Sequence, residues 1–248
     1  MLAPTLIIIP AHNEQEAIGK VLEDLRATAI VVDVLVIDDG STDDTAAEAR
    51  RHGASVVSHA FNLGYGATLL TGYRYACKQG YERIVQMDSD GQHDPGSVRD
   101  LLAALDQGAD VAIGSRYLTG TPPPTSFARK VGTSLFAGIA SFWTRSRITD
   151  PSSGFQAIRA NALTALTHDG FPEDFPDANT LIGLSREGFE LVEVPVTMHP
   201  RSTGTSMFGS HRVLYYGYKM FLSLFLLPIR RRSPYRAERM SAMNMRAR

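Results

Sequence analysis

This sequence has only one cysteine, a net charge close to zero and no long uninterrupted apolar run. Each of these features limits the kinds of protein it can be. Cys77 is the only cysteine among the 248 residues, so no disulfide forms within the chain, and a reducing compartment suits it. We predict that Cys77 is a buried small apolar residue, because nothing near it indicates a nucleophile. The most apolar segment, residues 213–229, is 17 residues long and carries Lys219. A spanning helix needs about 20 apolar residues, so we favour a helix on the membrane surface or against a partner.

The formal net charge is only −1, but it hides an asymmetry along the chain. Residues 228–248 contain seven Arg and one Glu, a net charge of +6, which leaves −7 for residues 1–227. The acidic body argues against nucleic acid as a partner, and the basic tail suits an anionic surface such as a membrane. The alternative is a disordered, solvated end, which we favour for residues 239–248.

The composition, 44% hydrophobic and 21% charged, is that of an ordinary globular protein. We predict one α/β domain over residues 1–207, an apolar helix over residues 208–230 and a basic, disordered tail over residues 231–248. No basic region or cleavage site precedes the first predicted strand. We therefore expect no signal peptide and a cytoplasmic protein that lies peripherally at the inner face of the cell membrane.

Apolar runs, polar loops and helical patterns follow one another in units of about thirty residues, which is typical of βαβ units. The run at residues 6–9 is apolar throughout, as in a strand buried on both faces of a parallel sheet. We therefore predict an α/β fold with a mostly parallel central sheet flanked by helices. Asn13 is the expected N-cap of the first helix, and Ser41 or Thr42 that of the second. The expected strands are residues 5–9, 31–37, 55–58, 83–87, 111–115 and 191–196.

An acidic stretch at residues 86–95 follows one of these strands and is the strongest candidate for a site. If the chain stays extended there, Asp88, Asp90 and Gln92 project to the same side, because alternate side chains of a strand share a face. Close carboxylates repel each other unless a hard cation lies between them, and Mg²⁺ or Mn²⁺ takes such oxygen ligands. The stretch therefore predicts a site for a metal and a diphosphate. A solvated turn would use the same residues.

Two more polar loops follow predicted strands: Asn13 with Glu14, and Asp38 with Asp39. Ligands of open parallel sheets bind beyond the carboxyl ends of the strands, so we expect these loops to share one site with the acidic stretch. Residues 62–67 contain a pair of glycines that would allow close backbone approach to a ligand. They lack the third glycine of a dinucleotide fingerprint, which excludes an NAD site.

Residues 129–146 form a predicted amphipathic helix with cations at both ends and apolar residues at helical spacing. Its apolar face could lie in a membrane interface, with the cations at lipid headgroups. Packing into the core is the other interpretation, and the sequence does not choose between them. Residues 119–125, rich in Pro, Gly and Thr, predict a mobile loop. The polar loop at residues 199–206 could close over phosphates.

Taken in order, seven stretches between residues 5 and 208 resemble the family 2 glycosyltransferases of GT-A fold. The resemblance is greatest to the branch that uses dolichyl or polyprenyl phosphate as acceptor for mannose or glucose. The matching stretches are residues 10–14, 38–43, 64–67, 88–93, 114–117, 150–155 and 193–196.

The resemblance implies roles for the strand-end residues in binding a nucleoside-diphosphate sugar and a metal. Asp88 would touch the ribose or a metal-bound water, and Asp90 with Gln92 would ligate Mg²⁺ or Mn²⁺ on the diphosphate. The residues that would surround the nucleotide are Pro10, Asn13, Glu14, Asp38, Asp39 and Gly66.

The resemblance also implies phosphate contacts from Arg116, Arg129 or Lys130, and Arg201. A guanidinium fork suits a phosphate, although a surface ion pair is the more common role of a single Arg. In the loop at 199–206 many relatives carry a Lys after the serine, whereas here Met207 follows Ser206.

We expect an inverting, metal-dependent transferase that moves a hexose from a donor of the GDP-mannose or UDP-glucose type to a polyprenyl phosphate. The membrane surface and an integral-membrane protein are the expected partners. A transferase acting on a sugar hydroxyl would need a general base, for which Asp177 stands at the matching place, although capping the helix that it opens is an equal alternative. A catalytically silent subunit that binds nucleotide sugars is the third interpretation.

Overall fold

The protein is described by a computed structural model that covers residues 3–118, 127–167 and 178–199, with the side chains of residues 127–131 outside the description. Several expectations lie outside these residues. They are the loop at 119–125, the helix-opening Asp177, the loop with Arg201, the apolar helix at 208–230 and the basic tail. None of the described helices is long and apolar enough to cross a membrane.

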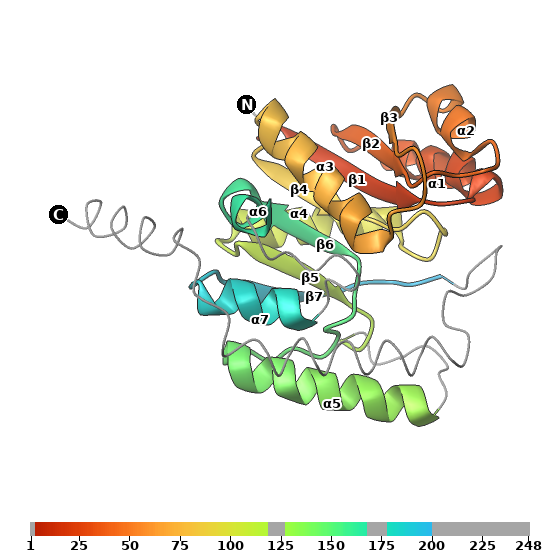
Figure 1. The fold of residues 1–248 in the computed structure, drawn as a ribbon. Coiled ribbons are helices and arrows are strands. Elements are labelled where there is room, and N and C mark those ends of the chain that lie inside the picture. Colours follow the sequence, from red (N-terminus) through yellow and green to blue (C-terminus); the bar gives the residue numbers. More distant parts are fainter. Residues whose placement is uncertain (1–2, 119–126, 168–177, 200–248) are drawn as a thin grey trace.

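Seven strands form one sheet in the order β3-β2-β1-β4-β6-β5-β7 (Figure 1). Four of the neighbouring pairs are parallel, while β6 runs antiparallel to both β4 and β5. The predicted mostly parallel sheet is therefore confirmed. The strands are β1 (Thr5–Ala11), β2 (Asp33–Asp38), β3 (Ser55–Ser58), β4 (Arg83–Gln86), β5 (Val111–Ser115), β6 (Gln156–Arg159) and β7 (Leu191–Pro195).

Strand β6 and the helix after it were not predicted from the sequence, and β6 determines what reaches the site. It is only four residues long and leads directly into α6 (Ala160–Thr167). Because it runs antiparallel to β4, with Gln156 opposite Gln86, the segment that enters β6 lies at the edge where β4 leaves the sheet. The turn at residues 150–155 is thereby brought beside the acidic stretch.

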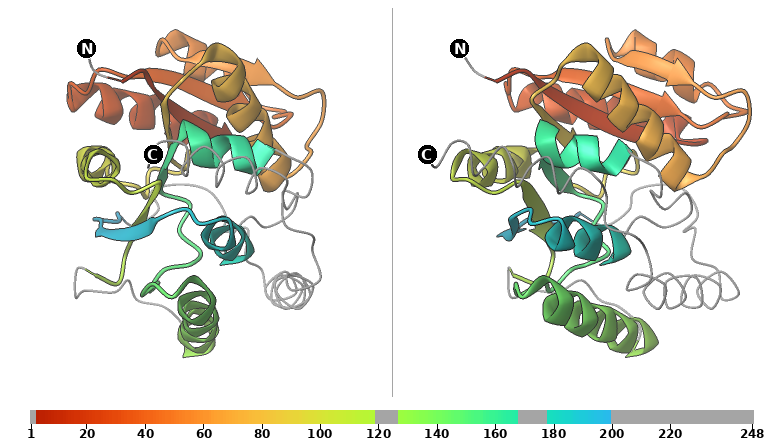
Figure 2. Two further views of the ribbon diagram at one scale, coloured as in Figure 1. Left: turned by 90° about the vertical axis from the view of Figure 1, so that its left-hand side faces the viewer. Right: turned by 60° about the vertical axis from the view of Figure 1, so that its left-hand side comes forward.

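Helices cover both faces of the sheet (Figures 1 and 2). On one face lie α1 (Gln15–Ala27), α2 (Thr45–Arg51) and α4 (Val98–Asp106), which follows the short 3-10 turn η1 (Pro95–Ser97). On the other face lie α3 (Tyr65–Gln79), α6 and α7 (Ala178–Arg186). Helix α5 (Phe127–Thr144) packs against α7 at the far side from α1. The strands therefore form the middle one of three layers, between two layers of helices.

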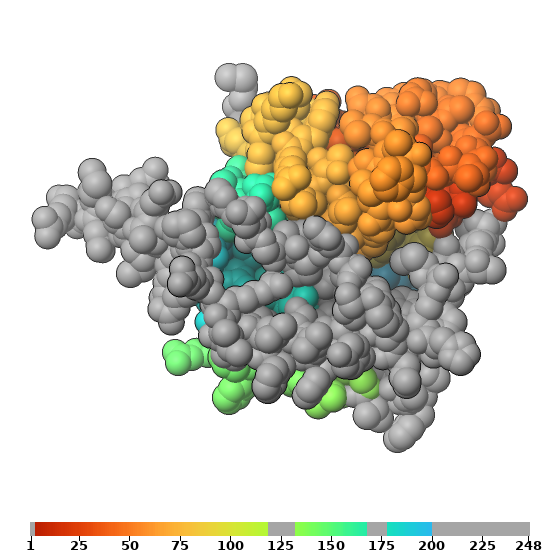
Figure 3. Space-filling model, in the orientation of Figure 1, coloured from red at the N-terminus to blue at the C-terminus, as the bar shows by residue number. Residues whose placement is uncertain are grey.

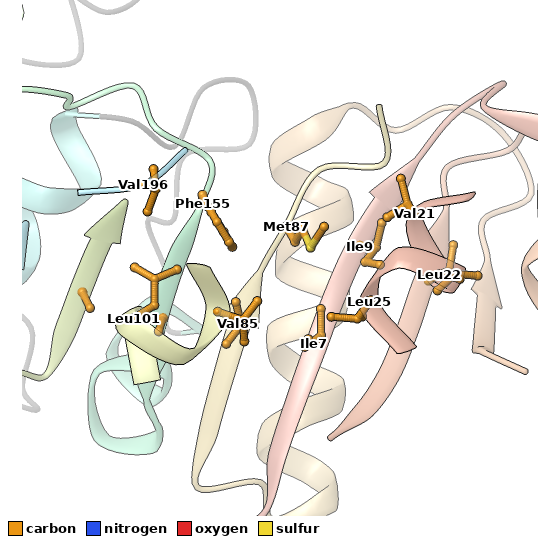
Figure 4. Close-up of a cluster of buried hydrophobic side chains, with 14 of the residues drawn as sticks. Ile7, Ile9, Val21, Leu22, Leu25, Val85, Met87, Leu101, Phe155 and Val196 are labelled. Atoms are coloured by element: carbon orange, nitrogen blue, oxygen red, sulfur yellow. The ribbon is translucent and has the colours of Figure 1, made fainter. Parts of the chain in front are cut away.

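The alternation of side chains along β1 divides the core between the two faces. Leu6 and Ile8 face α3, and Ile7 and Ile9 face α1 and α4, with all four side chains buried. Figure 4 shows Ile7 and Ile9 against side chains of α1, close to Met87 beyond β4. Burying one such side chain contributes about 1.5–3 kcal/mol. In the space-filling view the elements from β1 to α3 lie together as one continuous mass (Figure 3). The carboxyl ends of β1 and β4 are thus held rigidly.

Three local predictions were wrong. Asn13 is not the N-cap of α1, since Glu14 occupies that position without a side-chain bond. The N-cap of α2 is Asp44 rather than Ser41 or Thr42. Cys77 is exposed, because α3 buries the stripe that contains Leu69, Tyr73 and Ala76 and turns the next position towards solvent.

Candidate active site

The loops after β1 and β2 are bound to each other by hydrogen bonds from Asn13. Its backbone N–H donates to Ser41 Oγ at 2.9 Å, and its Oδ1 accepts from the Thr42 N–H at 2.8 Å. These bonds hold Asn13 at a φ of 55°, a left-handed conformation that asparagine tolerates better than most residues. The Glu14 N–H donates to Thr45 Oγ1 at 2.8 Å. Asn13 therefore fixes the shape of the predicted nucleotide site.

Asp39 is buried and binds the third loop to the second. Its carboxylate accepts from the N–H groups of Leu63 and Gly64, both at 2.9 Å, and from His59 Nδ1 at 2.8 Å. Burial alone would raise the pKa of Asp39, but these hydrogen bonds outweigh it and hold the pKa below its usual value. The carboxylate predicted to hold the nucleoside is thus engaged within the chain.

The other residues predicted to surround the nucleotide lie close to these loops. Asp38 is buried at the end of β2, where its Oδ1 accepts from the Ser41 N–H at 3.1 Å. Pro10 is buried near the end of β1, and Gly66 lies in the first turn of α3. The structure therefore gathers Pro10, Glu14 and Asp38 at one edge of the sheet, as expected, and their contacts with a nucleotide stay predictions.

The acidic stretch is not extended, so the geometry predicted for it was wrong. Strand β4 ends at Gln86, and the chain turns at residues 89–90. Asp90 Oδ1 accepts from the Gln92 N–H at 3.0 Å across this turn, which a φ of 75° at Gly91 completes. The Gln92 carbonyl accepts from the His199 N–H at 2.8 Å. Ligation of a metal by the Gln92 side chain stays a prediction.

His93 is the buried centre of this turn. Its ring stacks on Phe155 at a centroid distance of 4.6 Å, and its Nδ1 accepts from the Asp88 N–H at 3.0 Å. Burial lowers the pKa of His93, and this effect outweighs the carboxylates of Asp88 and Asp90, which favour the charged ring. A neutral ring that accepts at Nδ1 carries its proton on Nε2. His93 thus holds the backbone of Asp88 as a neutral group.

The side chain of Asp88 is oriented from the other face by α3. Tyr65 Oη donates to Asp88 Oδ1 at 3.0 Å and accepts from Gln86 Nε2 at 3.0 Å, while Gln86 Oε1 accepts from Tyr73 Oη at 2.6 Å. A Cβ atom at Gly154 would lie 2.8 Å from Tyr65 Oη and 3.1 Å from Asp88 Oδ2. The turn before β6 therefore packs directly against this carboxylate, which is 33% exposed.

Arg116 follows β5 and forms an ion pair with Asp150, which lies in the turn before β6. Its Nε and Nη2 donate to the two oxygens of the buried Asp150 carboxylate at 2.6 and 2.7 Å. Burial would lower the pKa of Arg116, but the bonds to Asp150 and the charge of Asp88 raise it above its usual value. Arg116 keeps 24% of its side chain exposed. The charge of Arg116 acts on His93, and the charge of Asp88 acts on Arg116. Asp88, His93 and Arg116 therefore form one cluster.

Glu193 of β7 completes this arrangement. Its carboxylate accepts from the N–H groups of Thr149 and Asp150 at 2.7 and 2.8 Å, and from Thr149 Oγ1 at 2.7 Å. Glu193 therefore fixes the backbone that carries the Asp150 carboxylate.

The charges at this edge decide which ligand can bind. Of the residues that the structure describes, the carboxylates of Asp88, Asp90 and Asp150 and one guanidinium, that of Arg116, lie near His93. A diphosphate would meet net repulsion there unless a cation accompanied it. The donors of the turn are oxygens, which suits Mg²⁺ or Mn²⁺. Among the described residues no three His, Cys, Asp or Glu side chains form a metal-binding group. Asp88 and Asp90 could offer carboxylate oxygens to such an ion, and Mg²⁺ usually completes its coordination with phosphate oxygens and water.

The side chains of four predicted site residues lie outside the described part of the structure. Arg129 and Lys130 lie in the first turn of α5, and their side chains are outside the description, while Asp177 and Arg201 lie outside the described residues. Conversely, the sequence analysis gave no role to Tyr65, His93, Asp150 or Glu193. All four stand in stretches that carried the family resemblance, which was the signal available, but no spacing rule pairs them with the residues that they hold.

Comparison with known proteins agrees with this geometry. The family model described as glycosyl transferase family 2 matches residues 6–167. The polyprenol monophosphomannose synthase of Mycolicibacterium smegmatis is 35% identical over 219 residues, which cover 84% of this chain and 82% of that protein. The undecaprenyl-phosphate mannosyltransferase of Micrococcus luteus is 34% identical over 220 residues, covering 81% of this chain and 86% of that protein.

Solved structures show a similar fold. The glucosyl-3-phosphoglycerate synthase of Mycobacterium tuberculosis in complex with Mn²⁺ and UDP-glucose superimposes with a TM-score of 0.66. The match covers 91% of this chain and 79% of that chain at 21% identity. At that identity the likeness shows the fold alone.

Proposed function

This chain belongs to glycosyl transferase family 2, and from that premise we propose that it transfers a hexose from a nucleoside-diphosphate sugar to a polyprenyl phosphate with inversion at the anomeric carbon. The acceptor is supported by the names of the relatives from M. smegmatis and M. luteus. Both names specify mannose, which favours GDP-mannose over UDP-glucose as the donor.

One observation in the structure carries the proposal: the carboxylates of Asp88, Asp90 and Asp150 and one guanidinium, that of Arg116, lie near a neutral, buried imidazole at the carboxyl edge of the sheet. Asp88 and Asp90 would hold Mg²⁺ or Mn²⁺, and such an ion supplies neutralisation of the charge that collects on the departing diphosphate. Arg116 stabilises the same charge by hydrogen bonding. Removing one donor of this kind typically lowers kcat about 10²- to 10³-fold.

The acceptor phosphate requires no general base. A phosphate monoester has a second pKa near 6, so it is mostly a dianion at neutral pH and attacks the anomeric carbon directly. The bond from that carbon to the diphosphate breaks as the new carbon–oxygen bond forms on the opposite face. In this proposal the carboxylates near His93 bind and orient, and none of them moves a proton.

We further propose that the enzyme works peripherally at the inner face of the cell membrane, where it meets a lipid-linked acceptor. Helix α5 supports this, because Leu135, Phe142 and Trp143 are 59%, 78% and 44% exposed. Ala140 of the same helix is buried in the core. One side of α5 therefore packs in the protein while the other presents Leu and aromatic side chains, as interfacial helices do.

The decisive experiment is a donor and acceptor screen. Purified protein is incubated with GDP-mannose, UDP-glucose or UDP-N-acetylglucosamine, with Mn²⁺ or Mg²⁺ and a short polyprenyl phosphate, and lipid-linked sugar is extracted and measured. We expect transfer from one donor, and its loss in Asp90→Ala. Tight nucleotide binding without transfer from any donor would instead indicate a silent binding subunit. Transfer only to a sugar hydroxyl, abolished by Asp177→Asn, would indicate the other class of acceptor.

A further inference from the structure

We propose that Glu193 is a positioning residue for the transfer reaction: through Thr149 and Asp150 it holds the Arg116 guanidinium against the reacting phosphate. The inference deepens the proposed function and rests on it, because it assumes that Arg116 meets a substrate phosphate. Within the described part of the chain, the hydrogen bonds of the Glu193 side chain go to Thr149 and Asp150 and to none of the predicted ligands of donor or metal.

The first step is the contact of Glu193 with the chain before β6. Both of its oxygens are engaged at short distances, one by the two backbone N–H groups of Thr149 and Asp150 and the other by Thr149 Oγ1. Hydrogen bonds to an ionised carboxylate are about twice as strong as neutral ones. Glu193 stands on β7, an edge strand of the sheet, and its partners lie 43 and 44 residues earlier in the chain. Three such bonds fix the backbone at Asp150.

The second step is the fork between Asp150 and Arg116. The two oxygens of Asp150 accept Nε and Nη2 of Arg116, and Oδ2 also accepts the Arg116 backbone N–H at 3.2 Å. A bidentate pair of this kind fixes the plane of the guanidinium as well as its position. Since Asp150 is buried, it cannot turn away to solvent while its backbone is held. The orientation of Arg116 therefore depends on Glu193.

The third step is the position of the Arg116 guanidinium relative to the candidate site. Arg116 is partly exposed, and it interacts electrostatically with Asp88. Ser115 Oγ, 2.7 Å from Thr149 Oγ1, also accepts the Tyr117 N–H at 3.2 Å, so the backbone on both sides of Arg116 is tied to the same segment. A loss at Glu193 would thus displace Arg116. Displacement of a catalytic group by about 1 Å can cost about 10²-fold in rate.

A double-mutant cycle tests the inference in the full chain. Glu193→Ala should lower kcat roughly 10- to 100-fold. In an Arg116→Ala background the same change should leave kcat nearly unaltered, because the group that Glu193 positions is already absent. Glu193→Gln keeps the shape and one carbonyl acceptor and should recover part of the rate. Glu190→Ala removes an exposed carboxylate just before β7 and serves as the matched control with unchanged kcat.

A second measurement does not depend on turnover. The Nε–H proton of Arg116, donated to Asp150, should exchange slowly with solvent in ¹⁵N NMR spectra of the wild type and of Glu190→Ala, and rapidly in Glu193→Ala. Protection that survives Glu193→Ala overturns the inference. So does a loss of kcat that is equal with and without Arg116, since Glu193 would then stabilise the fold generally. If the wild type transfers no sugar, the proposed function fails, and the proton exchange still decides whether Glu193 positions Arg116.

Discussion

Replacing Tyr65 with phenylalanine tests whether α3 orients the candidate metal carboxylate. The change deletes a hydroxyl that donates to Asp88 Oδ1 and accepts from Gln86 Nε2, each at 3.0 Å. Asp88 is partly exposed, so water can replace the lost donor there. Gln86 is buried, and a buried amide deprived of its acceptor costs about 1–3 kcal/mol. For a chain of this size that corresponds to a fall in Tm of about 2–4 °C for each kcal/mol.

The effect on function should exceed the effect on stability. Without the hydroxyl, Asp88 is free to rotate, so we expect a higher Mn²⁺ concentration for half-maximal transfer. The assay is a Mn²⁺ titration of the initial rate, beside thermal unfolding. Tyr75→Phe makes the same chemical change near the other end of α3, where the hydroxyl lies close to Tyr81, and should alter neither quantity. An unchanged Mn²⁺ dependence in Tyr65→Phe would refute the orienting role, whatever the Tm.

Three further outcomes are expected. Gly154→Ala places a Cβ atom 3.1 Å from Asp88 Oδ2 and should lower kcat/KM while the far-ultraviolet spectrum stays that of the wild type; full activity would show that the turn yields freely. Asp39 has a lowered pKa in the folded state, so its contribution to stability is present above the unfolded value near 3.9 and is lost as the pH falls through the folded value. Urea unfolding between pH 7 and pH 3 should therefore show a steeper acid loss for the wild type than for Asp39→Asn, and parallel curves would contradict this. Phe142→Ser should weaken sedimentation with anionic vesicles at unchanged Tm, whereas Val31→Ser, at a position that is 85% exposed, should not; equal sedimentation of both variants would count against α5 as the membrane contact.

The sequence predicted the parallel part of the sheet because β1 and β2 contain nearly continuous apolar runs, which are typical of a strand covered on both faces. It did not predict β6, since Gln156–Arg159 carries no alternation that separates strand from turn. The residues at 150–155 consequently entered the sequence analysis only as one of the stretches that carry the family resemblance. Only the antiparallel pairing of β6 with β4 and β5 shows that this turn lies between Asp88 and Arg116.

The acidic stretch shows a different limit. Its residues were identified as a site, but alternation along an extended chain was the wrong reason for expecting Asp88 and Asp90 to converge. Both carboxylates instead lie near His93, in a turn that is stabilised by long-range packing of that ring on Phe155. Contacts between residues so far apart in sequence leave no periodic signal, so the partners of Arg116 and Asp88 could be identified only from the folded chain.

The residues around Arg116 and the residues around Asp39 are held by different kinds of partner, and this bears on the choice of donor. On the transfer side, ion pairs and charged hydrogen bonds fix Arg116 and Asp150. On the predicted nucleotide side, the side chains of Asn13 and Asp39 accept hydrogen bonds from backbone N–H groups of neighbouring loops. The Asp39 carboxylate is therefore unsuited to binding a base, because that would break hydrogen bonds of a buried group at a cost of about 1–3 kcal/mol. Discrimination between guanine and uracil should therefore come from the loop backbones that these side chains shape. Asp39→Asn should accordingly change stability more than the preference between GDP and UDP, as competition between the two nucleotides would show, and a reversed preference would return Asp39 to direct contact with the base.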